Sequence, residues 1–154
     1  MPRQGFLGRA IAGRLVRSDF LYWLGLTLAH DWMMRSVLAT DPAVVAAASP
    51  AERERADTIL RQLLPISARS EGLLNDVRLV STRQRIALER ITAPTLVFSL
   101  EDDRYRTIEP ARIIAATIPG ARLVTYPTGG HVWVGHDAEL FAEADGFLRQ
   151  HEHP

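Results

Sequence analysis

Two short apolar runs in the last 60 residues of the chain, separated by one predicted helix, constrain the fold more than any other feature of the sequence. Residues 95–100 (TLVFSL) are largely apolar with β-branched and aromatic side chains, which is typical of a strand buried on both faces of a parallel sheet. Residues 122–126 (RLVTY) are a second short strand. Thr107 can cap a helix between them, and His136 or Asp137 opens a terminal helix. This order predicts an α/β fold with a right-handed parallel crossover, so that the loops after both strands emerge at the same edge of the sheet.

The first 90 residues show only helical patterns. Apolar residues recur at helical intervals over residues 18–40, and Asp41-Pro42 is expected to stop that helix. Ser49, followed by proline and then an acidic residue, is a clear helix opening. A third helix is predicted from about residue 67 to residue 83. The chain therefore divides into a helical part and an α/β part near residue 90.

Each predicted helix has an apolar side, which we expect to face the core. The aromatic stripe of the first helix is more typical of a packing face than of a cofactor site, so Trp23, Trp32 and Met33 are given no chemical role. The residues expected to face inward are Phe20, Trp23, Leu24, Leu28, Trp32, Leu38, Ala56, Ile59, Leu60, Leu63, Leu73, Leu74, Val77, Val80, Ile113, Ile114, Ile118, Leu140, Phe141, Ala144, Phe147 and Leu148.

The charge balance and the lack of cysteine exclude several classes of partner and of functional site. Eighteen basic and eighteen acidic residues cancel, so no overall field attracts nucleic acid or an anionic membrane. The absence of cysteine removes disulfides, thiolate metal sites and cysteine nucleophiles. We expect no nucleic-acid or membrane partner and no cofactor, and a cytoplasmic protein fits this composition.

The amino end has the order of a secretion signal, because arginines precede an apolar run at residues 20–29. That run is only ten residues long, too short for a membrane-spanning helix, and Ser18-Asp19 puts an acid where a signal would be basic. We therefore interpret it as an amphipathic helix. The arginines concerned are Arg3, Arg9, Arg14 and Arg17.

The two loops that follow the predicted strands carry the candidate site. Asp103 follows the first strand and His131 follows the second, 28 residues later, and the crossover brings these loops to one edge of the sheet. A carboxylate that accepts a ring N–H of histidine fixes the tautomer and stabilises the imidazolium that forms when the other nitrogen takes a proton. Asp102 competes with Asp103 for this role.

The other histidines have simpler interpretations. His136 is expected to be a cap or loop residue. His151 and His153 lie in the tail with no acid or histidine at ligand spacing, so no metal site is predicted. Trp133 is expected to pack under the loop that carries His131, although a place in a pocket wall stays open.

Residues 91–150 resemble the carboxy-terminal segment of α/β-hydrolases. The resemblance rests on residues 93–98 (APTLVF), 101–103 (EDD), 116–123 (ATIPGARL) and Gly129-Gly130-His131. It implies that Asp103 is the acid after the family's seventh strand and that His131 is the histidine after its eighth. By position, residues 1–90 would be the helical cap or lid of such an enzyme and residues 91–154 the carboxy-terminal core segment.

Departures from the family pattern are equally informative. Family members often have glycine where Leu100 stands and proline where Arg104 stands, so the acid loop is expected to differ in shape. The Gly-x-Ser-x-Gly nucleophile elbow is absent, and the family's oxyanion hole also comes from earlier strands. The serines at positions 67, 70 and 81 lie in predicted helices and are interpreted as surface or capping residues.

The resemblance implies a hydrolase of esters or related bonds, present as a carboxy-terminal piece that lacks its nucleophile and is inactive alone. A small-molecule substrate would be the partner of the whole enzyme. The alternative is a non-catalytic binding or assembly module, which would self-associate through the exposed edge of the first strand.

Overall fold

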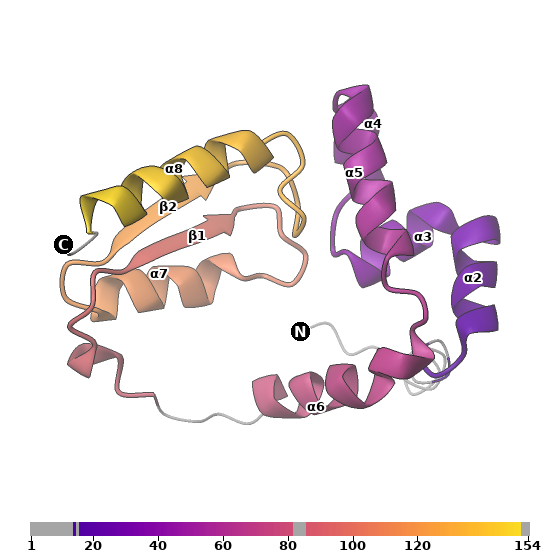
Figure 1. The fold of residues 1–154 in the computed structure, drawn as a ribbon, viewed down its shortest axis with the longest axis horizontal. Coiled ribbons are helices and arrows are strands. Elements are labelled where there is room, and N and C mark those ends of the chain that lie inside the picture. Colours follow the sequence, from indigo (N-terminus) through magenta and orange to yellow (C-terminus); the bar gives the residue numbers. More distant parts are fainter. Residues whose placement is uncertain (1–13, 15, 82–85, 152–154) are drawn as a thin grey trace.

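The computed structural model describes residues 14, 16–81 and 86–151 of the chain. These residues form seven α-helices, two 3-10 helices and one sheet of two parallel strands, so the α/β class is confirmed, with helix in the majority. Figure 1 shows helices α2 to α5 on one side and the sheet between α7 and α8 on the other, with α6 between the two parts along the chain. We call residues 16–81 the helical region and residues 91–151 the sheet region.

The helical region begins with two helices where one was predicted. The chain turns at Ala29, whose φ is −142°, and this residue separates α2 (Asp19–Leu28) from α3 (His30–Val37). A Cβ at Gly25 would lie 2.9 Å from the sulfur of Met33, so the two helices are in close contact here and a larger residue at position 25 would require the Met33 side chain to shift. The prediction of one helix over residues 18–40 is therefore wrong.

The next two helices both begin with a side-chain cap. Asp41 accepts a hydrogen bond from the backbone N–H of Ala43 (3.0 Å) and opens the short helix α4 (Pro42–Ala47), where the sequence suggested only a stop. Helix α5 (Pro50–Arg61) starts as predicted, because the Ser49 hydroxyl accepts from a backbone N–H of its first turn.

The third predicted helix is a 3-10 turn, η1 (Ser67–Arg69), followed by α6 (Ser70–Ser81). Its predicted apolar side is only partly buried, because Val77 and Val80 are exposed. The end predicted at residues 82–83 lies outside the described residues.

The sheet region follows the predicted order. After η2 (Leu88–Arg90), strand β1 (Leu96–Leu100) pairs in parallel with β2 (Arg122–Tyr126), first residue to first residue. Helix α7 (Ile108–Thr117) lies on one face of the sheet and α8 (Asp137–Gln150) on the other (Figure 1). The carboxyl ends of both strands point toward α4 and α5 (Figure 1).

Burial in the sheet region is lower than the sequence predicted. Only the last two residues of β1 are fully buried, none of the residues of α8 is buried, and Ile113, Phe141 and Leu148 are exposed. Two strands about 5 Å apart offer a strip no wider than one helix, so each flanking helix keeps much of its apolar side uncovered.

The main hydrophobic core therefore lies in the helical region. Met33 is buried there, whereas Phe20, Trp23, Leu28 and Trp32 are exposed, against the prediction that these four residues face inward. No helix among the described residues has the length and apolar character needed to cross a membrane. The buried core consists of Tyr22, Met33, Met34, Leu38, Val45, Ala56, Leu60, Ile66, Val132 and Val134.

Candidate functional site

Asp103 and His131 meet where β1 and β2 end. His131 Nδ1 lies 3.0 Å from Asp103 Oδ2. The Asp103 side chain is almost fully buried (3% exposed), whereas the imidazole is open to solvent (44%). A buried carboxylate behind an accessible imidazole is the arrangement in which the acid orients the ring and the ring meets other molecules.

Two further groups hold the Asp103 carboxylate. The backbone N–H of Tyr105 donates to Oδ1 (2.8 Å), and the Thr107 hydroxyl donates to Oδ2, the oxygen that also contacts His131. Behind Thr107, the buried hydroxyl of Ser99 lies 3.1 Å from the Thr107 hydroxyl. The carboxylate is thus held by the Tyr105 N–H and by Thr107, which Ser99 of β1 supports in turn. It therefore has little freedom to rotate away from the ring.

These contacts decide the charge of Asp103. Burial acts to raise the pKa of its carboxyl, but the hydrogen bonds from His131, Thr107 and the Tyr105 N–H, with the charge of His131, outweigh it and lower the pKa below its ordinary value. Asp103 is therefore an ionised acceptor at neutral pH. It favours the His131 tautomer with the proton on Nδ1, which leaves Nε2 as the basic nitrogen.

The neighbouring acid, Asp102, has a different partner. Its two oxygens accept hydrogen bonds from the backbone N–H groups of Gly129 (3.1 Å) and Gly130 (2.8 Å). Of the two acids left open by the sequence, Asp103 is the one in contact with the imidazole. Asp102 instead ties the loop after β2 to the loop after β1.

Glycine is required at both positions before His131, because other side chains approach the backbone closely there. Gly129 and Gly130 have φ of 135° and 62°, a region that favours glycine. A Cβ at Gly130 would lie 2.4 Å from the Thr40 hydroxyl, and one at Gly129 would lie 2.4 Å from a methyl of Leu100. Thr40 is fully buried, and its hydroxyl donates to Leu38 and accepts from the backbone N–H of His131 (3.0 Å).

Three non-glycine residues near the Asp103–His131 pair have a positive φ. They are Ala39 (47°), Arg106 (59°) and Trp133 (63°), one in each of the segments that converge on the Asp103–His131 pair. The backbone N–H of Arg104 donates to the Ala39 carbonyl (3.2 Å), which joins two of these segments. Such conformations cost about 1–2 kcal/mol each and persist where surrounding contacts impose them, often at functional sites.

Tyr105 spans the two regions beside the imidazole. Its ring meets the His131 ring edge to face with centroids 4.8 Å apart, and its hydroxyl donates to the carbonyl of Val37 (2.9 Å). Burial and the negative charge of Asp103 raise the pKa of this phenol, so it remains a neutral donor at neutral pH. Tyr105 therefore restricts the imidazole from the side.

Two histidines after His131 have local roles, whereas His30 of α3 contacts Asp57 of α5, with Nε2 2.8 Å from Oδ1. His136 is the N-cap residue of α8, one of the two roles predicted for it, and its ring stacks on Tyr126 (4.3 Å) and contacts the Glu139 carboxylate. His151 bonds a carbonyl of its own helix, and His153 lies outside the described residues. Among residues 14, 16–81 and 86–151, no group of three or more potential ligands could hold a metal ion.

The serines interpreted as surface or capping residues lie in the helical region, away from the Asp103–His131 pair. The Ser67 hydroxyl and backbone N–H both donate to Asp19, and the Ser70 hydroxyl bonds the Ser67 carbonyl. The side chain of Ser81 is outside the described part of the chain. Trp133 packs edge-on against Phe98, with ring centroids 6.1 Å apart, as expected of a residue under the loop.

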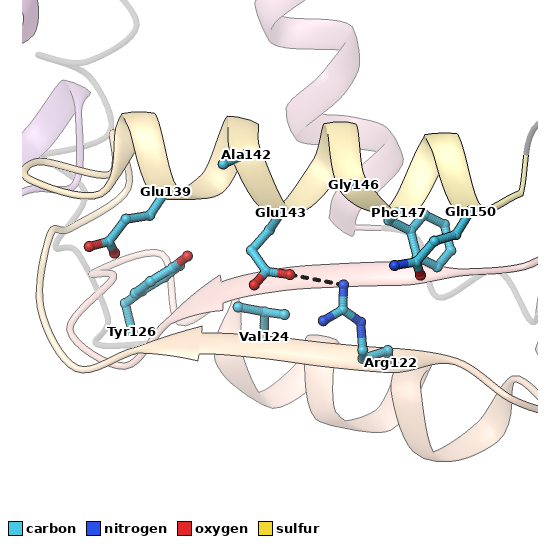
Figure 2. A pocket seen from close by; sticks show the side chains of 9 residues that line it. All are labelled: Arg122, Val124, Tyr126, Glu139, Ala142, Glu143, Gly146, Phe147 and Gln150. Atoms are coloured by element: carbon cyan, nitrogen blue, oxygen red, sulfur yellow. Dashed lines mark hydrogen bonds and ion pairs between the residues drawn. The ribbon is translucent and has the colours of Figure 1, made fainter.

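A shallow groove of about 840 Å³ lies away from this pair, between β2 and α8 (Figure 2). It contains the exposed ion pair of Arg122 with Glu143 (2.9 Å). Because the groove is open and its ion pair is solvated, we base no chemistry on it and keep the site at the strand ends.

Sequence reasoning missed three supports of the site. Thr107 was expected to cap α7, but its side chain makes no capping bond and serves Asp103, four residues before it. Tyr105 has no signal in the sequence that separates it from the other residues of the loop after the first strand. Thr40 had no signal at all, because it lies 91 residues from the histidine whose backbone it holds.

No protein-family model, curated protein or solved structure matches this chain. The site is therefore interpreted from its own geometry and from the resemblance carried by its motifs.

Proposed function

We propose that Asp103 and His131 are the acid and the histidine of a nucleophile–histidine–acid triad, and that the chain is the carboxy-terminal part of an α/β-hydrolase with its helical cap. The observation that carries this proposal is the 3.0 Å contact between His131 Nδ1 and the buried Asp103 carboxylate, at the carboxyl ends of two adjacent parallel strands. Ligand sites of open α/β sheets lie at such ends.

The mechanism that this pair supports is nucleophilic hydrolysis of an ester or related bond. His131 Nε2 takes the proton of a nucleophile as it attacks, and the ionised Asp103 stabilises the resulting imidazolium. The imidazolium then gives its proton to the leaving group, and the neutral ring activates water to release the product. The sequence contains no Gly-x-Ser-x-Gly elbow, so the nucleophile and the oxyanion donors come from outside these 154 residues.

The uncovered apolar side chains beside the sheet support this proposal. Ile113 on α7 and Phe141 and Leu148 on α8 are exposed, although they occupy positions of predicted inward-facing stripes. A wider sheet, continued from the open edge of β1, would give both helices a surface to cover.

The test uses a polypeptide that also includes the sequence encoded upstream, assayed with an activated ester. We expect turnover that His131→Ala abolishes and that Asp103→Asn lowers by about 10⁴-fold, the effect known for the acid of a serine-protease triad. Asp102→Asn is the matched control and should have a far smaller effect. Turnover by the 154-residue chain alone, or turnover that survives His131→Ala, would contradict the proposal.

A second candidate is a binding or assembly module that uses the same open strand edge. Within the described residues β1 pairs only with β2, and an unpaired edge is a template for another strand. Light scattering of the purified chain separates the two functions. A stable dimer without hydrolysis by the extended polypeptide favours the module.

A further inference from the structure

The loop that carries His131 is embedded in the helical region. Val132 and Val134 both belong to the buried core there, together with Ala56 and Leu60 of α5. The two valines are separated by one residue and enter the same core, and His131 directly precedes them. The position of the histidine therefore depends on elements more than 70 residues away in sequence.

Two charged side chains of α5 bind the backbone of this loop. Glu52 and Arg55 form a two-point ion pair, with Nε to Oε1 at 3.0 Å and Nη2 to Oε2 at 2.8 Å. Arg55 Nη2 also donates to the carbonyl of Val132 (2.8 Å), and Glu52 Oε2 accepts from the backbone N–H of Gly135 (2.8 Å). Asp137, just beyond the loop, adds an ionic contact to Arg55 at 3.6 Å.

This arrangement is partly shielded from solvent, so its hydrogen bonds are stronger than those of a surface ion pair. Only about a quarter of either side chain is exposed. Arg55 and the Gly135 N–H keep the pKa of Glu52 below its ordinary value despite partial burial, so the pair stays ionised at neutral pH. The guanidinium reaches a carboxylate and a carbonyl together, which a lysine ammonium cannot do with the same geometry.

We infer that Glu52 and Arg55 form a clamp that positions His131 against Asp103 by fixing the loop from residue 132 to residue 135. The clamp and Thr40 hold the loop on both sides of the imidazole, because Thr40 binds the His131 N–H and Arg55 binds the Val132 carbonyl. Glu52 and Arg55 are positioning residues. Their importance for hydrolysis rests on the proposed function, whereas their effect on the ring does not.

The test is the Arg55→Lys variant of the full chain, observed by ¹⁵N NMR of the His131 ring. The wild-type ring should be mainly in the Nδ1–H form, and the variant should shift toward the Nε2–H form that an unconstrained histidine side chain favours. Exchange of the Gly135 amide should accelerate roughly tenfold or more, as expected when a hydrogen bond to a charged group is weakened. Arg61→Lys is the matched control, on the same helix but exposed, and should change neither signal.

A second variant separates positioning from stability. Glu52→Gln should produce the same shift of tautomer, and Glu54→Gln, an exposed carboxylate on the same helix, should not. If Arg55→Lys and Glu52→Gln lower the urea midpoint but leave the tautomer ratio of the folded protein unchanged, the clamp is only structural and the inference is overturned. These spectra need no nucleophile or substrate, so a failure to hydrolyse esters would count against the proposed triad alone.

Discussion

The helical region and the sheet region bury their apolar residues in different ways. Helices α3 and α5 each bury two residues completely in a shared core, whereas α8 buries none of its own. The loop after β2 nevertheless contributes Val132 and Val134 to the helical core. The sheet region provides the candidate site, but its histidine loop depends on the helical region for burial.

Conformational stability and candidate chemistry are therefore divided between the two regions. The Asp103 contacts come from the sheet region itself, whereas the His131 backbone is held by Thr40 and its loop by α5. A change in the helical core is thus expected to reach the site, and a change on the outer surface of α8 is not.

The same leucine-to-alanine substitution should have very different effects on stability in the two regions. Leu60→Ala removes a fully buried side chain (0% exposed) and should lower the free energy of unfolding by about 2–5 kcal/mol. Leu148→Ala, at 63% exposure on α8, should change it by less than about 0.5 kcal/mol. Urea unfolding followed by circular dichroism measures both. Equal losses at the two sites would mean that α8 is covered in solution.

Two glycine-to-alanine substitutions test the contact between the two regions. Gly130→Ala introduces a Cβ into the Thr40 side chain at a positive φ, and should cost about 2–4 kcal/mol from steric overlap and backbone strain. Gly120→Ala has a similar φ of 75° but nothing within 4 Å, so about 1–2 kcal/mol is expected from strain alone. Thermal unfolding of the two variants should differ accordingly, and identical melting temperatures would argue against a close approach at Thr40.

A smaller loss is expected when the Thr40 hydroxyl is removed. Thr40→Val leaves the His131 N–H and the Leu38 carbonyl without their buried partner, which should cost about 1–3 kcal/mol. Thr117→Val is a suitable control, because its hydroxyl bonds a carbonyl of its own exposed helix surface. Chemical denaturation should rank the two losses, and an equal effect would remove Thr40 from the list of supports.

The smallest expected effect is the acid dependence contributed by Asp103. Its pKa is lowered in the folded chain, so its ionised form stabilises folding at pH values above the ordinary value of 3.8, and this contribution disappears as the pH falls through the lowered value. The urea midpoint of the wild type should therefore fall more steeply than that of Asp103→Asn as the pH is lowered below about 4. Parallel curves would show that the carboxylate gains nothing from its contacts.

Much of the sheet region could be predicted from the sequence, because its signals are local. The two strands, the parallel crossover and the meeting of Asp103 with His131 follow from short apolar runs and one intervening helix. The Ser49 cap of α5 could also be predicted from the local sequence. The prediction that failed is the burial of the apolar side of α8, because that burial requires a sheet wide enough to cover the helix.

The helical region was harder to predict for a similar reason. Residues 18–40 have an unbroken helical pattern, and nothing in that pattern marks the break at Ala29, beyond which Met33 packs beside Gly25. Asp41-Pro42 can end one helix or begin another, and the structure uses it to begin α4. The candidate pair was predictable, but its supports, Thr40 and the Glu52–Arg55 clamp, were not, because no periodicity connects them to the histidine.

The insertion of Val132 and Val134 into the helical core has a consequence for protein engineering. A chimera that joins residues 91–151 to an unrelated set of helices would keep both strands and both loops, yet its histidine would sit on a segment with no matching recess. Exchange of the helices of the helical region should therefore preserve the packing site of these two valines, even where every other residue of those helices is redesigned.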